Sequence, residues 1–465
     1  MAGTPLKDKY LTEQHPRDWI AHAVLWHIYP LGFVGAEDRA QAGEAVVHRL
    51  PQLTAWLDYA VNLGVSGLLL APIFASSTHG YDTIDHFQID SRLGDDADFD
   101  ELIAAAHRRG LRVVLDGVFN HVGREHPQFR RAVADGPRSS QPSWFRLSWP
   151  PDAGPGSEPD YATFEGHRQL VALNHDEPAV ADLVTRVMSH WLDRGADGWR
   201  LDAAYAVPRP FWQRVLPAVR ARHPDAYIVG EVIHGDYAGF VRDTGVDAVT
   251  QYELWKAIWS ALNDRNFFEL AWALERHNAL LDSFVPQTFI GNHDVTRIAS
   301  QLVDQRHLAH ALVILMLCAG TPSIYAGDEQ AFRGLKEHRA GGDDAIRPAF
   351  PATPALLAPF GWPTYRLHQE LIGLRRRHPW LHRARSRATE LHNTDFIFEV
   401  SCENDRLWVA LNLADAPVTR AIPASVEKLA GDLAVAGTGA TSEIAIPAHG
   451  WGVLAGQPRQ PGRLG

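Results

Sequence analysis

The sequence is poor in cysteine, with only Cys318 and Cys402 among 465 residues. Cys318 lies in an apolar run and Cys402 in a distant strand-like stretch, so the two cysteines provide no disulfide framework. The first residues lack an apolar signal core, and no apolar run is long enough to span a bilayer. We therefore expect a cytoplasmic protein without a membrane-spanning segment.

The sequence also lacks a basic excess, because 44 Lys and Arg stand against 55 Asp and Glu, a formal net charge of −11. Nucleic acids and anionic membranes attract basic surfaces, so neither is an expected partner. The one basic run, Arg375–Arg377, is interpreted as a solvent-exposed helix face. Apolar residues at 46% and charged residues at 21% are typical of a soluble globular protein.

Short apolar runs alternate with longer helical patterns along most of the chain. The predicted strands are Val24–Tyr29, Val65–Pro72, Leu111–Val118, Gly198–Asp202, Ala226–Val229, Asp247–Gln251, Thr288–Gly291 and Pro322–Ala326. The helical patterns are Leu50–Leu63, Ala97–Arg109, Ala179–Arg194, Pro210–Arg222, Leu254–Leu262 and Leu302–Leu317. Alternating strands and helices imply parallel pairing, and eight strands close a barrel, which predicts an α/β fold of the (β/α)8 TIM-barrel type. The alternative is an open doubly wound sheet, but no glycine-rich phosphate fingerprint follows the first strand.

Two segments break this alternation. From about Val122 to His175 the chain is rich in Pro, Gly, Ser, Trp and Phe with little helical periodicity, which indicates a small inserted domain. After about Leu381 the pattern changes to alternating β-type runs, which predicts an antiparallel C-terminal β-domain. We expect the barrel at 1–121 and 176–382, the inserted domain at 122–175 and the β-domain at 383–465.

Three carboxylates, Asp202, Glu231 and Asp294, each stand at the carboxyl end of a predicted strand. An acidic side chain at the mouth of a buried strand is costly to leave unpaired, so its repetition indicates a functional site. TIM-barrel active sites lie at this end of the strands, and convergent carboxylates are what glycosidic bond cleavage requires. Arg200 shares the strand face of Asp202, and we expect it to hold Asp202 ionised.

Six strings, taken in order, resemble the motifs of the α-amylase family, glycoside hydrolase family 13. They are Gly80-Tyr81-Asp82, Asp116 to His121, Arg200-Leu201-Asp202, Gly230-Glu231-Val232, Asn292-His293-Asp294 and Gly320 to Glu329. The resemblance covers almost the whole chain and implies the same three-part layout. It also implies that Asp202 is the nucleophile, that Glu231 is the general acid/base and that Asp294 binds sugar hydroxyls.

The resemblance further implies a set of substrate-binding residues, namely Tyr81, Asp116, His121, Arg200, His293, Asp343 and Arg347. Among them, Tyr81 matches the aromatic residue that stacks on the sugar at the cleavage point. Asp343 and Arg347 match a loop after strand eight that contacts the next sugar.

One residue of these motifs is a candidate metal ligand. Asn120 matches a residue that contributes to a calcium site in many family members, but the inserted segment lacks a dense acidic cluster. We keep Asn120 as a candidate calcium ligand and expect no required cofactor. Asn120–His121 and His293–Asp294 are also candidate zinc ligand pairs, because histidine and carboxylates bind zinc.

The residues that follow two of the carboxylates bear on the substrate. Starch-degrading members commonly carry a Lys-His pair after the nucleophile, where this chain has Ala203-Ala204-Tyr205-Ala206. Gly230 to His234 resembles the cyclomaltodextrinase and neopullulanase branch, although the first strand begins by about Val24 and leaves no room for that branch's N-terminal β-domain.

We therefore expect a retaining hydrolase of α-1,4 linkages in short or cyclic malto-oligosaccharides, with cyclic maltosyl-maltose as one specific candidate. The expected partner is an α-glucan oligosaccharide, and a homodimer is a candidate assembly. The alternatives are a transglycosylase or α-glucosidase of the same family, a metal-dependent hydrolase, and a barrel without catalytic activity.

Overall fold

The computed structural model describes residues 18–456 except 42, 44, 139–142, 340, 438 and 439. Parallel strands form its centre: β1 (Leu25–Ile28), β2 (Gly67–Leu70), β5 (Arg112–Val118), β11 (Gly198–Asp202), β12 (Tyr227–Gly230), β13 (Ala248–Val249), β14 (Gln287–Phe289) and β15 (Thr321–Tyr325). These eight strands pair in the order β13-β12-β11-β5-β2-β1-β15-β14. A parallel bridge between Thr250 and Gln287 joins the two ends of this sheet and closes the barrel. The eight predicted strands are confirmed, and the open-sheet alternative is wrong.

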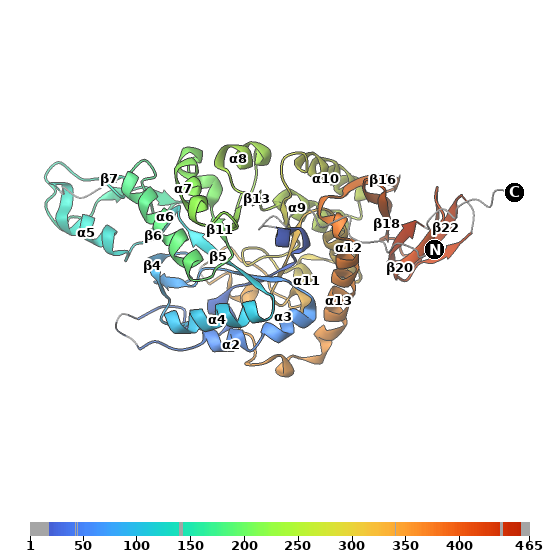
Figure 1. Cartoon of the computed structure of the whole chain (residues 1–465), viewed down its shortest axis with the longest axis horizontal. Helices are drawn as coiled ribbons and strands as arrows, with labels where there is room; N and C mark the ends of the chain where they lie inside the picture. The colour runs from blue at the N-terminus through green and yellow to red at the C-terminus, as the bar shows by residue number, and fades with distance from the viewer. Residues whose placement is uncertain are drawn as a thin grey trace, which may run out of the picture.

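Helices surround the barrel (Figure 1). They are α1 (Pro30–Phe33), α2 (Leu50–Thr54), α3 (Leu57–Leu63), α4 (Asp96–Arg108), α6 (Pro178–Asp193), α7 (Arg209–Arg222), α8 (Tyr237–Thr244), α9 (Tyr252–Asn263), α10 (Phe267–Leu280), α11 (Ile298–Gln301), α12 (Leu308–Leu317) and α13 (Trp362–Arg377). The pattern over Leu50–Leu63 predicts one helix where the structure has two. The helices α1, α8, α10 and α11 were not predicted, and of α13 only the basic run Arg375–Arg377 was assigned to a helix. Within the described part of the chain, every helix is too short or too polar to span a bilayer.

The basic run at the end of α13 is only partly exposed. Arg376 and Arg377 face solvent, whereas Arg375 is buried. The Arg375 guanidinium donates to the backbone oxygens of Met316, Cys318 and Gly320 at 2.6–2.9 Å. These carbonyls lie at and beyond the end of α12, where the helix leaves acceptors without partners. The interpretation of the whole run as a solvent-exposed face is therefore wrong for Arg375, and burial lowers the pKa of this group to about 10.

The segment between β5 and α6 forms a small unit at one end of the molecule (Figure 1). Its elements are β6 (His121–Gly123), α5 (Pro127–Asp135), β7 (Leu147–Ser148), β8 (Asp160–Tyr161), β9 (Thr163–Phe164) and β10 (His167–Ala172). The helix α5 was not predicted, because Phe129 is its one buried residue and a single apolar contact gives no periodic pattern. The Phe129 ring packs edge-on against Phe145 and Tyr161, with ring centroids 5.3 and 5.0 Å apart.

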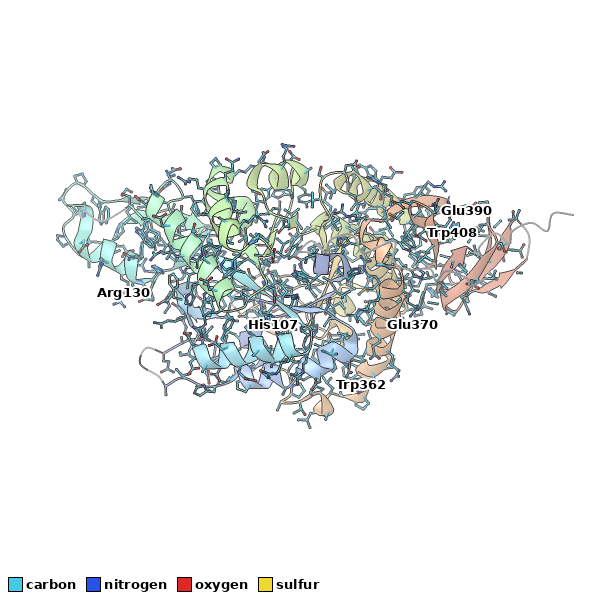
Figure 2. All side chains as sticks on the ribbon, in the orientation of Figure 1. His107, Arg130, Trp362, Glu370, Glu390 and Trp408 are labelled. Carbon is cyan, nitrogen blue, oxygen red and sulfur yellow. The ribbon has the colours of Figure 1, made fainter. Side chains whose placement is uncertain are left out.

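The C-terminal part folds into antiparallel sheets at the opposite end of the molecule (Figure 1). One sheet contains β16 (Arg385–Leu391), β17 (Asp395–Cys402), β18 (Asp405–Asn412), β23 (Trp451–Gly456) and β20 (Val426–Gly431). The other contains β19 (Val418–Ile422), β22 (Ser442–Ile446) and β21 (Ala434–Ala436). A separate apolar cluster that includes Ile397, Trp408 and Ile444 lies between them, and Trp408 is labelled in Figure 2. The predicted antiparallel β-domain is confirmed.

Candidate active site

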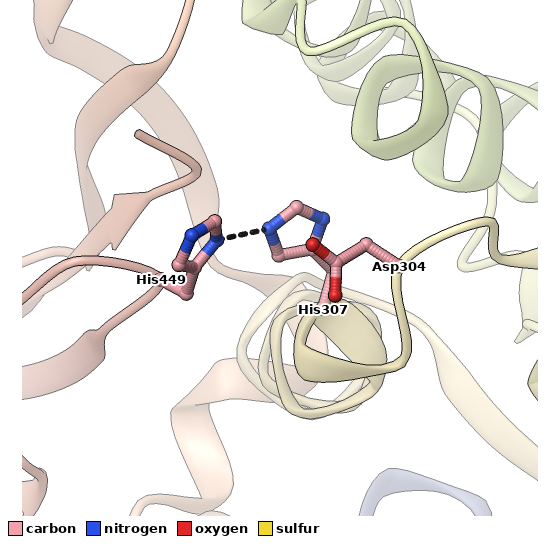
Figure 3. Close-up of side chains that lie close together, drawn as sticks. All are labelled: Asp304, His307 and His449. Carbon is pink, nitrogen blue, oxygen red and sulfur yellow. Dashed lines mark hydrogen bonds between the residues drawn. The ribbon is translucent and has the colours of Figure 1, made fainter. Parts of the chain in front are cut away.

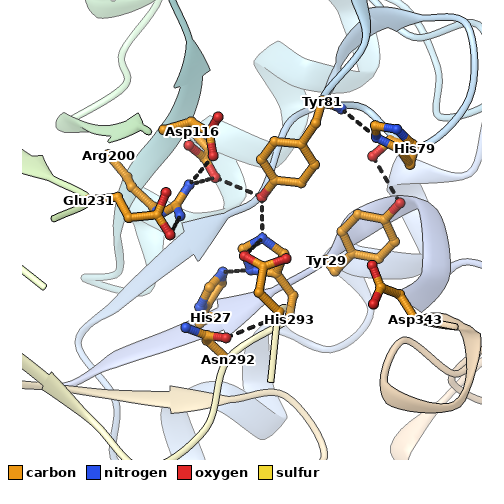
Figure 4. A network of polar contacts seen from close by, with 12 residues as sticks. His27, Tyr29, His79, Tyr81, Asp116, Arg200, Glu231, Asn292, His293 and Asp343 are labelled. Atoms are coloured by element: carbon orange, nitrogen blue, oxygen red, sulfur yellow. Dashed lines mark hydrogen bonds and ion pairs between the residues drawn. The ribbon is translucent and has the colours of Figure 1, made fainter. Parts of the chain in front are cut away.

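The register of three neighbouring strands brings Asp116, Arg200 and Glu231 together (Figure 4). Arg200 on β11 pairs with Asp116 on β5, and Leu201 pairs with Gly230, the last residue of β12. Glu231 follows Gly230 directly and therefore lies level with Asp202 at the carboxyl ends of the strands. The sequence predicted each strand end, and the barrel register places them side by side.

One guanidinium contacts three carboxylates. Arg200 Nη1 lies 2.5 Å from Asp116 Oδ2 and 3.2 Å from Asp202 Oδ1, and Nη2 lies 2.8 Å from Glu231 Oε1. All four side chains are buried. A single positive charge cannot compensate three buried negative charges, so the cluster favours the uptake of a proton.

Arg200 acts on Asp202 against the effect of burial. Burial raises the pKa of Asp202 well above its ordinary value, the Glu231 carboxylate adds to the shift, and Arg200 lowers the pKa in part. Burial likewise raises the pKa of Asp116 despite its contact with Arg200. Arg200 thus favours an ionised Asp202 but is shared among three acids, and the ionisation of Asp202 stays a prediction.

Two further donors orient Glu231. The Tyr252 hydroxyl donates to Oε1 at 3.1 Å, and the backbone N–H of Ala203 donates to Oε2 at 2.9 Å. Ala203 adopts the left-handed conformation, with φ of 45°, which turns the chain sharply after Asp202. Tyr252 was not predicted as a site residue. The sequence feature that could have indicated it is a hydroxylated aromatic residue directly after a predicted strand.

Asp294 has a different environment, with a third of its side chain exposed. His293 Nε2 lies 2.9 Å from Oδ2, and Arg347 Nη2 donates to Oδ1 at 2.9 Å. Burial alone would raise the pKa of Asp294, but His293, Arg347 and Arg200 together lower it well below its ordinary value. Arg347 also lies 2.9 Å from Asp343, so the structure brings these two predicted residues to the same site.

A chain of polar contacts links Tyr81 to the first strand (Figure 4). The Tyr81 hydroxyl donates to Asp116 at 3.0 Å and contacts His293 Nε2, and the Tyr81 and His293 rings are nearly parallel. His293 Nδ1 lies 3.2 Å from Nε2 of His27 on β1. Burial and the neighbouring His293 and Arg200 lower the pKa of His27 well below its ordinary value, so His27 is neutral. His27 was not predicted as a site residue. The sequence feature that could have indicated it is a histidine inside an apolar strand.

His121 joins the barrel to the inserted unit. Its Nε2 lies 3.0 Å from the backbone oxygen of Tyr81, and its ring stacks on Phe164 with centroids 4.7 Å apart. The Asn120 side-chain amide lies 3.2 Å from His121 Nδ1. Burial lowers the pKa of His121 to about 3, so a neutral ring with its proton on Nε2 satisfies both contacts.

In the described part of the chain, two groups of histidine and acidic residues have ligand atoms close enough to hold a metal ion. They are Asp304–His307–His449 and His48–Asp95–Asp98. Neither group contains Asn120 or His293, so the metal-dependent alternative gains no support from them. Calcium at Asn120 stays a prediction.

Two hollows are lined by other residues of the strand ends and of the inserted unit. One, of about 780 Å³, is lined by His79, Asp82 and Asp343 among others. The other, of about 400 Å³, lies between the barrel and the inserted unit and is lined by residues that include Phe164, Glu165 and Tyr205. The Tyr205 hydroxyl donates to Glu165 at 3.0 Å, which ties the loop after β11 to the inserted unit.

A closed (β/α)8 barrel with a carboxylate cluster at its strand ends and a unit inserted after the third barrel strand is the architecture of a barrel glycoside hydrolase. The comparison with known families agrees, since residues 28–351 match the alpha amylase catalytic domain. The chain belongs to the α-amylase family.

Among curated proteins, the chain is 33% identical over 343 residues to a cyclomaltodextrinase of Geobacillus thermopakistaniensis, across 68% of this chain and 57% of the relative. The match thus spans little more than half of that relative. A solved structure of the debranching enzyme of Nostoc punctiforme is 27% identical, with a TM-score of 0.80 over 94% of this chain and 99% of that one. The cyclic alpha-maltosyl-(1→6)-maltose hydrolase of Arthrobacter globiformis is 26% identical, with a TM-score of 0.77 over 95% of this chain and 100% of that one.

Proposed function

We propose that the protein is a retaining α-glucoside hydrolase that cleaves α-1,4 linkages in short or cyclic malto-oligosaccharides. The observation that carries the proposal is the contact of one guanidinium, that of Arg200, with both Asp202 and Glu231. Because Asp202 and Glu231 contact the same guanidinium, their carboxyl groups lie close enough to act on one carbon of the substrate, as a double displacement requires.

In the first step, Asp202 attacks the anomeric carbon and forms a glycosyl ester, while the bond to the leaving oxygen breaks and Glu231 gives that oxygen its proton. In the second step, water attacks the same carbon, gives a proton to Glu231 and releases Asp202. The cycle begins with a proton on Glu231 and with Asp202 as the charged nucleophile.

The other residues hold the sugar. Asp294 is ionised and partly exposed, which suits an acceptor for sugar hydroxyl groups. Tyr81, Asp116, His121, Arg200 and His293 surround the sugar at the cleavage point in this proposal, with Asp343 and Arg347 at the next sugar. We also propose the domain boundaries 1–121, 122–175, 176–382 and 383–465. Calcium takes part in none of these steps.

The substrate assignment has two supports. The relatives that the chain resembles include a cyclomaltodextrinase and, over nearly the full length of both chains, a cyclic maltosyl-maltose hydrolase. In addition, the hollow beside Tyr205 measures about 400 Å³, and the Tyr205–Glu165 hydrogen bond crosses from the barrel to the inserted unit there. A bridged hollow of this size suits a short leaving group better than a long polymer.

A substrate panel tests the proposal. We expect kcat/KM for cyclodextrin, cyclic maltosyl-maltose and maltotriose to exceed that for starch at least about tenfold, a difference of ~1.4 kcal/mol in transition-state binding. The panel also contains isomaltose, sucrose and trehalose, with products resolved by chromatography. Tyr205→Ala should narrow the gap between short substrates and starch, and Tyr205→Phe, which removes only the hydroxyl, is the matched control.

Equal activity on starch would contradict the substrate assignment. Longer oligosaccharides as the main product at high maltose concentration would identify a transglycosylase instead.

A further inference from the structure

A second cluster of chemically active side chains lies where the barrel meets the C-terminal sheets (Figure 3). Asp304 caps a single 3-10 turn, Gln305–His307, that ends at His307 just before α12. His449 comes from the turn before β23 of the C-terminal part. Each of the three side chains offers a ligand atom, and these atoms all lie within 4.8 Å of one another. None of the three residues contributes to the site described above.

The two histidines face each other through ring nitrogens, with Nε2 of His307 3.0 Å from Nδ1 of His449. The opposite nitrogen of His449, Nε2, lies 2.8 Å from Asp415 Oδ1. A carboxylate only accepts, so Nε2 of His449 carries a proton directed at Asp415, and Nδ1 is the nitrogen that faces His307. This is the arrangement in which a metal-binding histidine gives its other N–H to a carboxylate.

His307 is buried, with 2% of the residue exposed, and its Nε2 is the ring nitrogen that faces His449. Moving the His307 proton from Nε2 to Nδ1 frees the lone pair of Nε2, with no proton released. His310 is held elsewhere, because its Nε2 lies 3.1 Å from the backbone oxygens of Asn412 and Gly450. The second of these contacts fixes the turn that carries His449.

We propose that Asp304, His307 and His449 bind one Zn²⁺ ion that links the barrel to the C-terminal β-domain, with water as the fourth ligand. Two imidazole nitrogens and one carboxylate oxygen form a ligand set that zinc favours, at bonds of about 2.0–2.2 Å. Ligand atoms already within 4.8 Å of one another reach a tetrahedral arrangement through small side-chain rotations.

Two arginines lie beside the Asp304–His307–His449 cluster. Arg306 contacts Asp304 at 2.6 Å, and Arg265 contacts Asp415 at 3.2 Å. The Arg306 side chain is 59% exposed, and exposed ion pairs of this kind contribute little to stability. Arg306 contacts both Asp304 oxygens, so Zn²⁺ displaces it from one of them, and the Asp415–Arg265 contact stays in place behind His449.

The experiment uses the full-length protein without a histidine tag, stripped of metal and titrated with Zn²⁺. We expect one bound Zn²⁺ per chain by calorimetry and metal analysis, and a rise of several °C in Tm, because a ligand that binds only the folded state stabilises it. Titration with Co²⁺ should give the visible absorption bands of a tetrahedral site. Hydrolytic activity should not change.

Matched variants separate this site from general histidine binding. His449→Gln and His307→Asn should each lower Zn²⁺ affinity at least tenfold and abolish the Co²⁺ bands. His48→Ala removes the histidine of the other candidate group and should leave both unchanged. The Co²⁺ spectrum is read from folded protein, so a variant of lower stability still gives a result. Absence of stoichiometric binding in the unaltered chain, or unchanged binding in His449→Gln, would overturn the proposal.

Discussion

Replacing Asp202 by Asn should lower kcat at least ~10⁴-fold on every substrate while sugar binding stays within a few-fold of the original. The amide has the shape of the carboxylate, but its oxygen is too weak a nucleophile to form the glycosyl ester. The substitution also removes one negative charge from a cluster in which three acids share Arg200, so the fold should tolerate the change. Steady-state kinetics and calorimetry with maltotriose measure the two effects separately.

The same substitution at Asp343 is the control. Asp343 contacts Arg347 at 2.9 Å rather than the buried carboxylates, so Asp343→Asn should raise KM with a much smaller effect on kcat. Turnover in Asp202→Asn comparable to that of the unaltered protein would remove Asp202 as the nucleophile.

Replacing Glu231 by Gln should produce a defect that depends on the leaving group. On malto-oligosaccharides we expect a loss of ~10²–10⁴-fold in kcat, because the leaving oxygen receives no proton. With α-glucosyl fluoride, whose leaving group departs with little protonation, formation of the glycosyl ester should fall less than about tenfold. Asp202→Asn should be inactive on both, so the ratio of the two rates distinguishes the nucleophile from the proton donor.

Glu231 also accepts hydrogen bonds from Tyr252 and from the Ala203 N–H, so a purely structural role has its own signature. Loss of those contacts would slow both substrates equally. Equal losses in Glu231→Gln would therefore contradict its assignment as general acid.

The barrel was predictable because its strands are short apolar runs that alternate with helical patterns, and several of the runs end at a residue with recognisable chemistry. Arg200 and Asp202 are two residues apart on one strand, so their shared face followed from the period of a strand. The contact of Arg200 with Asp116 and Glu231 was not predictable in the same way, since it depends on the register of β5, β11 and β12. That register also shares Arg200 among three acids, which the sequence did not predict.

Tyr252 and His27 reach the site from elements that carry no motif. Tyr252 begins α9, and His27 lies inside β1 with apolar neighbours. The order of the barrel strands brings their side chains to Glu231 and His293, because β13 lies beside β12 and one strand separates β1 from β14. Arg375 shows the opposite error. The basic run predicted a solvent-exposed side chain, whereas the Arg375 guanidinium is buried and donates to the carbonyls at and beyond the end of α12.

The central claim is that Asp202 and Glu231 perform a double displacement at the anomeric carbon. Proton NMR during the first turnovers of an α-1,4-linked substrate, recorded before the product equilibrates in water, tests this most directly. The account predicts that the newly released sugar appears as the α-anomer, because two inversions restore the original configuration. Appearance of the β-anomer first would mean a single displacement by water and would contradict the glycosyl–Asp202 intermediate.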